Sequence, residues 1–309
     1  MKPMKTKLKS SSCVACHPFS AVVCAGAVML IASGAQAQNL FVSDYYSGNI
    51  YEYTPGGTRG TFAPGLADPF GLAFNSAGDL FEADGNEFGN SGSIYEFTPG
   101  GMRSTFASGL ITPYGLAFNS AGDLFAADGS AGNIYEYTPG GARSTFASGL
   151  AAPAGLVFNS AGDLFEADGN SGTIYEFTPG GARSTFASGL NNPYGLAVNG
   201  MGDLFEADSS SGNIYEFTPD GVKSTFASGL SQPEGLAINS AGDLFVADEQ
   251  SDNIYEYTPG GTRSTFASGL ANPIALAIQP VPEPSALALL AVGATALLVR
   301  RRCAIAKLR

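Results

Sequence analysis

The sequence predicts an all-β fold, a six-bladed β-propeller with four strands in each blade. A degenerate first repeat begins at Asn39, and 41 glycines in 309 residues supply many tight turns. Each repeat is about 40 residues long and holds four short strand patterns, which is typical of a propeller blade. The segment Asp-Leu-Phe-x-Ala-Asp marks the later repeats, in steps of 44, 40, 40 and 40 residues, at Asp79, Asp123, Asp163, Asp203 and Asp243.

The third repeat shows why each strand is expected. Residues 115–119 and 123–128 are apolar runs separated by a Ser-Ala-Gly turn, and residues 134–138 are β-branched and aromatic. Pro139-Gly140 fits the central positions of a type II turn that leads into a fourth strand over residues 141–146. The strands are apolar on both faces, as expected where each blade packs between two neighbours.

The two ends of the repeat array are complementary. The array begins in a second strand at Leu40 and ends in a first strand over residues 273–278. We therefore expect the C-terminal strand to join the N-terminal blade and close the ring, which removes exposed strand edges. The predicted propeller domain covers residues 38–280.

A charge pair recurs in the outer half of every repeat. With Pro139-Gly140 as the hairpin loop, Glu136 is expected opposite Arg143. Equivalent pairs use every basic residue of the propeller domain. Such cross-strand pairs contribute about 0.2–1 kcal/mol each, so a structural role is expected.

The first 37 residues have the layout of an export signal. Four lysines precede an apolar run over residues 21–34, which is expected to be a short helix. Ala35-Gln36-Ala37 places small residues where a signal peptidase reads the chain. Residues 1–37 are therefore expected to be a Sec signal peptide that is cut after Ala37.

Residues 281–309 combine a short motif, an apolar run over 285–299 and a basic cluster. They resemble the PEP-CTERM sorting tail of Gram-negative bacteria. The resemblance implies a short membrane helix that holds the protein in the inner membrane, processing by an exosortase, and a final place at the cell surface or outside it. An ordinary C-terminal anchor is the alternative. The resemblance is carried by Pro282, Glu283 and Pro284 of the motif and by Arg300, Arg301 and Arg302 of the cluster.

Composition excludes several classes of function. The propeller domain holds 26 of the 27 carboxylates and six of the 15 basic residues, which argues against nucleic acid as a partner. It has no histidine and no cysteine, so mechanisms that need either are excluded there. Cys13-x-x-Cys16-His17 has the haem c attachment pattern, but it precedes the apolar run of the signal, so haem is not expected.

The repeat itself, Pro-x-Gly-Leu-Ala, then Gly-Asp-Leu-Phe-x-Ala-Asp, then Gly-Asn-Ile-Tyr-Glu, resembles the NHL repeat over residues 39–279. Two enzyme families have related propellers. Resemblance to the regucalcin-like gluconolactonases (SMP-30) implies a divalent metal at the channel mouth, held partly by residues that follow the loop prolines. Only Glu234 offers a carboxylate there. Resemblance to the virginiamycin B lyases implies histidine chemistry, which the domain lacks.

Positions that differ between the repeats mark the candidate site. They are the residue after each loop proline, the fourth residue of each second-strand motif, and one loop that is extended only in the second repeat. Because first strands start and second strands end on the same rim, we expect these residues around the channel mouth. The alternative is that the aromatic residues plug the channel and the glutamates are solvated. The candidate ligand-binding residues are Phe70, Tyr114, Tyr194, Glu234, Glu82, Glu166, Glu206 and Phe88.

The six aspartates that end the second strands allow two interpretations, a ring of calcium ligands or acceptors of backbone N–H bonds. Aromatic faces beside carboxylates suit sugar rings and their hydroxyl groups. The expected function is therefore an exported, envelope-associated binding or scaffold module without catalysis, for extracellular polysaccharide or a surface protein. No cofactor is expected, although a divalent cation stays open. The alternative is a metal-dependent hydrolase of the gluconolactonase type.

Overall fold

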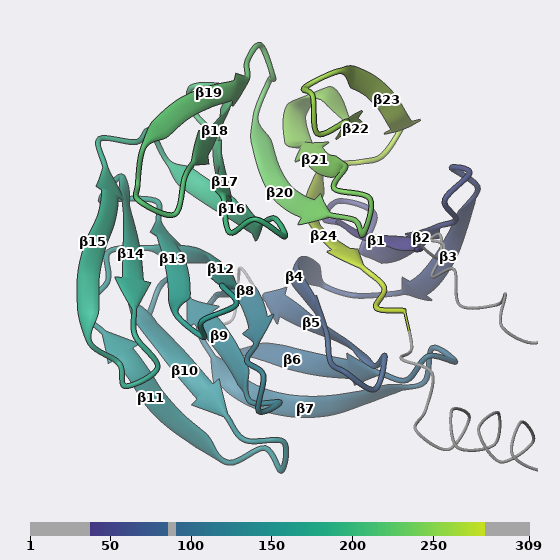
Figure 1. Cartoon of the computed structure of the whole chain (residues 1–309). Coiled ribbons are helices and arrows are strands. Elements are labelled where there is room, and N and C mark those ends of the chain that lie inside the picture. Colours follow the sequence, from purple (N-terminus) through teal and green to yellow (C-terminus); the bar gives the residue numbers. More distant parts are fainter. Residues whose placement is uncertain (1–37, 86–90, 282–309) are drawn as a thin grey trace, which may run out of the picture. The chain divides into compact units, whose positions relative to one another are not determined.

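The computed structural model describes residues 38–85 and 91–281. Within these residues, 24 strands form six antiparallel sheets of four strands each (Figure 1). The sheets are the blades of a propeller, numbered here along the chain from blade 1 (β24, β1, β2, β3) to blade 6 (β20, β21, β22, β23). This confirms the predicted fold class. The helices predicted at the chain ends lie outside the described residues.

The strands of each blade run in order from the channel outward, except that β24 provides the inner strand of blade 1. The inner strands are β4 (Asp68–Phe74), β8 (Pro113–Phe118), β12 (Pro153–Phe158), β16 (Pro193–Val198), β20 (Pro233–Ile238) and β24 (Pro273–Ile278). The second strands are β1 (Leu40–Asp44), β5 (Leu80–Gly85), β9 (Leu124–Asp128), β13 (Leu164–Asp168), β17 (Leu204–Asp208) and β21 (Leu244–Asp248).

The third strands are β2 (Asn49–Tyr53), β6 (Gly92–Phe97), β10 (Asn133–Tyr137), β14 (Thr173–Phe177), β18 (Asn213–Phe217) and β22 (Asn253–Tyr257). The outer strands are β3 (Arg59–Pro64), β7 (Arg103–Leu110), β11 (Arg143–Ser148), β15 (Arg183–Ser188), β19 (Lys223–Ala227) and β23 (Arg263–Ser268). A short 3-10 helix, η1 (Glu249–Ser251), follows β21.

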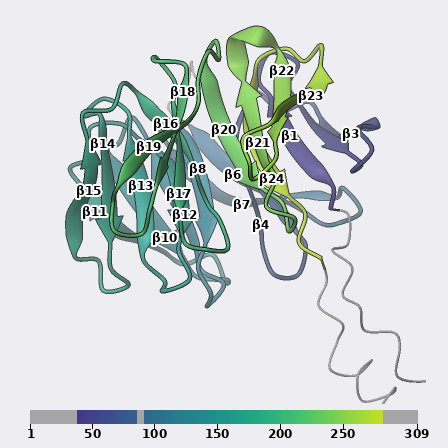
Figure 2. The ribbon, with the colours of Figure 1, turned by 45° about the horizontal axis from the view of Figure 1, so that its top comes forward.

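The ring closes as the sequence predicts, because β24 pairs antiparallel with β1 (Figure 2). The Gln279 N–H also donates to the Asn39 carbonyl at 2.9 Å, so both ends of the described ring lie on one rim. Ser43 marks the closure: its hydroxyl donates to the Phe70 carbonyl of blade 2 at 2.7 Å and accepts the Ala275 N–H at 2.9 Å.

The core lies between the blades rather than within one sheet. Phe81 of β5, for example, meets Phe106 and Phe118 edge to face, with ring centroids 5.0 Å apart in both pairs. Equivalent aromatic contacts recur around the ring. Both faces of every second strand are therefore buried, which explains their continuous apolar pattern. Burial of this apolar surface is the main stabilising contribution.

Glycine in the inner strands allows neighbouring blades to approach closely. A Cβ on Gly195 of β16 would overlap the backbone carbonyl oxygen of Glu234 in β20. The equivalent glycines of the other repeats face the same obstacle, whereas blade 1 has Ala275. This close backbone approach narrows the central channel.

The outer hairpins differ from the prediction. Gly141, and not Gly140, has a positive φ of 81°, and its N–H donates to the Thr138 carbonyl at 2.8 Å. The loop is therefore a three-residue loop that ends in a left-handed glycine, as in a type I turn followed by a bulge. The predicted type II turn at Pro139-Gly140 is wrong.

The extra loop residue changes the strand register by one. Arg143 lies opposite Tyr137, and Glu136 lies opposite Ser144, so the predicted Glu136–Arg143 pairing is wrong. The Arg143 guanidinium instead lies over the ring of Tyr135, with 4.9 Å between its central carbon and the ring centroid. The same stacking of a cation on tyrosine occurs in all six blades.

Candidate functional site

The rim on which first strands start and second strands end carries a hollow over the central channel. Pro113 pairs with Asp128 in blade 3, which places these two strand ends on the same rim, as expected. The hollow has a volume of about 290 Å³ and is called the mouth below. Its lining residues are Tyr45, Tyr46, Phe70, Tyr114, Tyr194, Glu234, Glu249, Asn272 and Ile274.

Five aromatic rings follow one another around the mouth, and we call them the aromatic arc. The ring centroids of Tyr46 and Tyr45 are 5.2 Å apart, and those of Tyr45 and Phe70 are 5.3 Å apart. Phe70 then meets Tyr114 at 4.7 Å, and Tyr114 meets Tyr194 at 5.9 Å. The arc thus joins residues of blades 1, 2, 3 and 5.

Blade 6 closes the mouth with Glu234 and Glu249, the acidic wall. The Gln232 side-chain N–H group donates to a carboxylate oxygen of Glu249 and, at 3.3 Å, to Glu234. The Asn272 side-chain N–H group also donates to Glu249. Gln250 in turn donates to the Gln232 side-chain oxygen at 2.7 Å. Amide groups, rather than cations, therefore hold the two carboxyl groups in place.

The acidic wall depends on an unusual loop in blade 6. Here η1 replaces the glycine-containing turn of blades 1, 3, 4 and 5, and Asp252 takes the left-handed conformation with φ of 55°. The Asp252 carboxylate accepts the backbone N–H of Asn272 at 3.1 Å. This loop aligns Glu249 with Glu234, the second residue of the inner strand β20 of the same blade.

Burial gives the mouth unusual proton affinities. Burial raises the pKa of Glu234 well above its usual range, and the nearby Glu249 carboxylate raises it further. Burial also raises the pKa of Tyr194, with Glu234 as the next cause.

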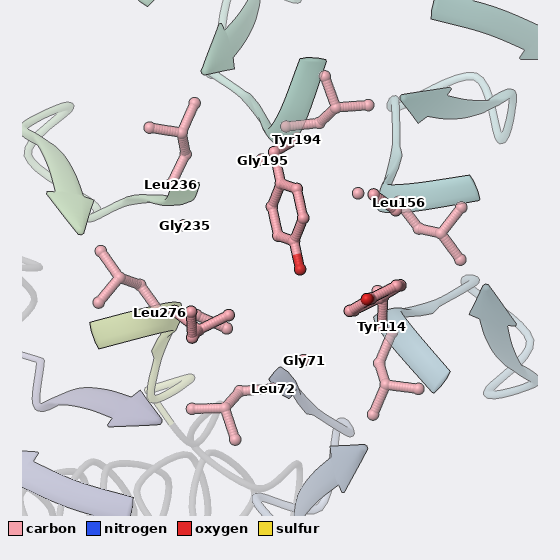
Figure 3. Close-up of a pocket in the computed structure, with 16 residues that line it drawn as sticks. Gly71, Leu72, Tyr114, Leu156, Tyr194, Gly195, Gly235, Leu236 and Leu276 are labelled. Atoms are coloured by element: carbon pink, nitrogen blue, oxygen red, sulfur yellow. The ribbon is translucent and has the colours of Figure 1, made fainter. Parts of the chain in front are cut away.

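The channel continues below the mouth as a narrow passage of about 90 Å³. Figure 3 shows Tyr194 reaching into it from β16 with Tyr114 beside it, and leucines surrounding the passage. The aromatic residues therefore line the mouth and also narrow the channel beneath it.

Four of the predicted site residues meet at the mouth: Phe70, Tyr114, Tyr194 and Glu234. Sequence comparison of the repeats missed Tyr45, Tyr46, Glu249 and Asn272. A usable signal was present, because the residue after each terminal aspartate also differs between repeats. In order, these residues are Tyr45, Gly85, Gly129, Gly169, Ser209 and Glu249.

In blades 2 and 3 this second variable position is matched to the first. A Cβ on Gly129 would lie 2.6 Å from the ring of Tyr114, and a Cβ on Gly85 would overlap the ring of Phe70. Glycine at these places therefore makes room for the ring of the same blade. In blade 6, the corresponding pair is Glu249 and Glu234.

Glu82, Glu166 and Glu206 do not line the mouth. All three have 0% exposed surface and lie between blades. Glu166 shares a face of β13 with Leu164, which packs against Phe125 of blade 3. Burial raises the pKa of Glu82 well above its usual range and those of Glu166 and Glu206 to about 9. The described residues offer no hydrogen-bond partner to either oxygen of Glu166 or Glu206.

The terminal aspartates of the second strands bind backbone. Asp128 accepts the N–H groups of Ile111 at 2.9 Å and Thr112 at 2.8 Å, and the other five aspartates accept from equivalent loops. This arrangement favours the backbone-acceptor interpretation, with donors mainly from the loop before the first strand. Within residues 38–85 and 91–281, no three acidic, histidine or cysteine side chains are grouped to hold a metal ion.

The acidic wall fits a resident divalent metal poorly. Among the described residues, it offers two carboxyl groups, Glu234 and Glu249. Asn272 directs an N–H donor, and not its oxygen, at Glu249. Divalent cations prefer several converging oxygen ligands.

Some predicted residues lie outside the described part of the chain. They are Phe88 of the extended loop and all residues assigned to the sorting motif and basic cluster. In the part that the structure describes, no helix combines the length and apolarity needed to cross a bilayer.

The fold agrees with the family to which the chain belongs. Residues 35–278 match the SMP-30/Gluconolactonase/LRE-like region, and the chain is a member of this family. Residues 280–302 match the PEP-CTERM protein-sorting motif. No curated protein matches the sequence.

Several solved structures share the propeller. A chain from a nidogen/laminin complex has a TM-score of 0.71 at 20% identity, covering 80% of this chain and 99% of its own. An inactive variant of virginiamycin B lyase from Staphylococcus aureus, solved with quinupristin, has a TM-score of 0.61 at 14% identity, with 80% and 94% covered. A putative gluconolactonase has a TM-score of 0.58 at 17% identity, with 66% and 79% covered. At these identities the likeness concerns the fold.

Proposed function

We propose that the chain is an exported, envelope-associated binding module whose mouth takes a sugar unit of extracellular polysaccharide. This proposal rests on the mouth, a hollow of about 290 Å³ that is lined by the aromatic arc and by the acidic wall. That volume is near the lower end of the roughly 300–1,000 Å³ usual for small-molecule sites. Aromatic faces pack against sugar rings, and carboxyl and amide groups bond their hydroxyls.

The sequence motifs supply the proposed location. Residues 1–37 would act as a Sec signal peptide, and residues 281–309 as a tail that holds the protein in the inner membrane of a Gram-negative bacterium. The PEP-CTERM match supports recognition of Pro282, Glu283 and Pro284 by an exosortase, followed by release to the surface. A propeller delivered in this way would meet matrix polysaccharide or another surface protein.

The test is retention of the full-length chain on an oligosaccharide array. We expect the chain to bind selected oligosaccharides. Tyr114→Ala should lower the affinity at least about tenfold, because packing of aromatic rings against sugar rings supplies much of the contact area. Tyr135→Ala, in the middle of the third strand β10 and outside the lining of the mouth, is the matched control and should bind normally. Failure of every oligosaccharide to bind, or equal binding by Tyr114→Ala, would contradict the proposal and favour a protein partner.

A metal-dependent hydrolase is the second candidate, favoured by family membership and by the place of Glu234 after Pro233. Its test is lactone hydrolysis by the full-length chain with added calcium, manganese or zinc. Turnover that requires the metal and is lost in Glu234→Ala would establish this candidate. Turnover that persists in Glu234→Ala would place any hydrolysis elsewhere.

A further inference from the structure

Both parts of the mouth favour positive charge. The faces of aromatic rings carry negative electrostatic potential, so a cation above them is attracted. Five such rings are contiguous in the aromatic arc. The acidic wall adds Glu234, which is 6% exposed, and Glu249. A ligand in the mouth would therefore contact aromatic rings on one side and carboxyl oxygens on the other.

The described residues supply no cation of their own to this place. The basic residues between positions 38 and 281 all begin outer strands and lie over tyrosine rings. Those strand ends face the rim opposite the mouth, because the third strands start on the mouth side. Within the described residues, Glu249 is held by the amides of Gln232 and Asn272 instead.

We propose that the mouth binds an organic ammonium group, which lies within the aromatic arc and against the acidic wall. The inference rests on the proposed function, because it assigns the ligand chemistry of the same mouth. Ring faces cannot ligate a bare metal ion, but they bind alkylammonium groups well. Such a group is carried by the amino sugars of a deacetylated polysaccharide and by free small cations.

Calorimetric titration of the full-length chain tests this chemistry with two pairs of probes. A glucosamine hexamer is compared with its N-acetylated counterpart, and tetramethylammonium with tert-butyl alcohol, an uncharged body of similar shape. We expect the charged member of each pair to bind at least about tenfold more tightly. In nuclear magnetic resonance, ring currents should shift the methyl protons of bound tetramethylammonium upfield, which binding at an exposed acidic surface would not do.

Matched variants assign the effect to the acidic wall. Glu234→Gln keeps the size and hydrogen-bonding capacity of the side chain, and it should reduce ammonium binding by at least about tenfold. Glu256→Gln makes the same charge change in the same blade on the opposite rim, and it should bind as the wild type does. If Glu234→Gln proves unfolded, the inference is tested by ammonium binding to Glu249→Gln and by the upfield methyl shift in the wild type.

The outcomes separate this inference from the proposed function. Equal or tighter binding of the N-acetylated hexamer would overturn the ammonium inference and leave sugar binding intact. If tetramethylammonium binds and neither hexamer does, the ammonium inference is supported. The ligand is then a free small cation, and the proposed binding of polysaccharide is contradicted. Binding of neither charged probe, or binding that Glu234→Gln leaves unchanged, would overturn the inference.

Discussion

Two sets of buried glutamates in this propeller have opposite surroundings. Glu234 opens onto the mouth and has Gln232 and Glu249 as polar neighbours. Glu166 and Glu206 lie between blades among apolar side chains, with no hydrogen-bond partner among the described residues. Variation between repeats draws attention to both sets equally. The difference teaches that variation between repeats marks both site residues and residues buried between blades. The polar or apolar surroundings of each side chain then distinguish the two kinds.

The largest expected effect concerns pH. Burial raises the pKa of Glu166 and Glu206 to about 9, so the folded state holds two protons that the unfolded chain has released. Between the unfolded pKa of about 4.3 and about 9, the free energy of unfolding should fall by up to about 1.4 kcal/mol per pH unit for each group. Urea unfolding between about pH 6 and pH 9 measures this slope.

The control is a double variant with Glu166→Val and Glu206→Val, since Val42 and Val246 occupy the same position in other repeats. Its slope should be flatter than that of the wild type by the contribution of both groups. An unchanged slope would show that these carboxyl groups are hydrated in the folded protein.

The reverse substitution has the next largest effect. Val246 is fully buried between blades 5 and 6, in the place that Glu206 takes one repeat earlier. Val246→Glu would bury another carboxyl group without a partner, at a cost of about 1–3 kcal/mol at neutral pH. Thermal unfolding at two pH values measures the loss, which should shrink in acid. A loss that is independent of pH would indicate a packing defect rather than a buried acid.

The contact between Arg143 and Tyr135 should influence stability less than the buried glutamates do. Arg143 lies over Tyr135 at an exposed place, where such contacts contribute about 0.5–1 kcal/mol. Arg143→Gln should therefore reduce the free energy of unfolding by no more than that amount, measured in urea. Added salt should leave the difference in free energy of unfolding between this variant and the wild type nearly unchanged. A larger loss would mean that the outer hairpin depends on ionic contacts with other strands.

The smallest effect on folding is expected at the mouth, where Glu234→Gln removes repulsion from Glu249 and keeps an acceptor for Gln232. The substitution should be visible in another quantity, because Glu234 contributes to the raised pKa of Tyr194. Ultraviolet titration of the tyrosines should show one group with a lower pKa in the variant. An unchanged titration would place Glu234 farther from Tyr194 than the structure does.

Much of this molecule can be predicted from its sequence, because six similar repeats disclose period, strand number and ring closure together. The hairpin register could also have been predicted. The fifth repeat has Asp220 where a type II turn needs a residue with positive φ, and Gly221 follows it. A three-residue loop satisfies all six repeats, and it places each basic residue over a tyrosine ring rather than opposite a glutamate.

The candidate site was harder to predict. Glu82, Glu166 and Glu206 are the third residues of their second strands, below the rim, and both faces of these strands pack against neighbouring blades, whereas the prediction placed the whole motif at the rim. Glu249 belongs to a loop that becomes a 3-10 helix only in blade 6. Its significance appears when it is compared with glycine at the same place in other repeats, since that glycine makes room for an aromatic ring.

The hydrogen bond between Gln279 and Asn39 has a practical consequence for handling the protein. Both ends of the described ring leave from the rim that lies opposite the mouth. A sensor surface or a fluorescent protein attached through either end would therefore approach from behind, and the mouth would remain open to solvent. Immobilisation through residue 38 or residue 281 should give the same ligand affinity, which makes the orientation of the ring measurable on a biosensor.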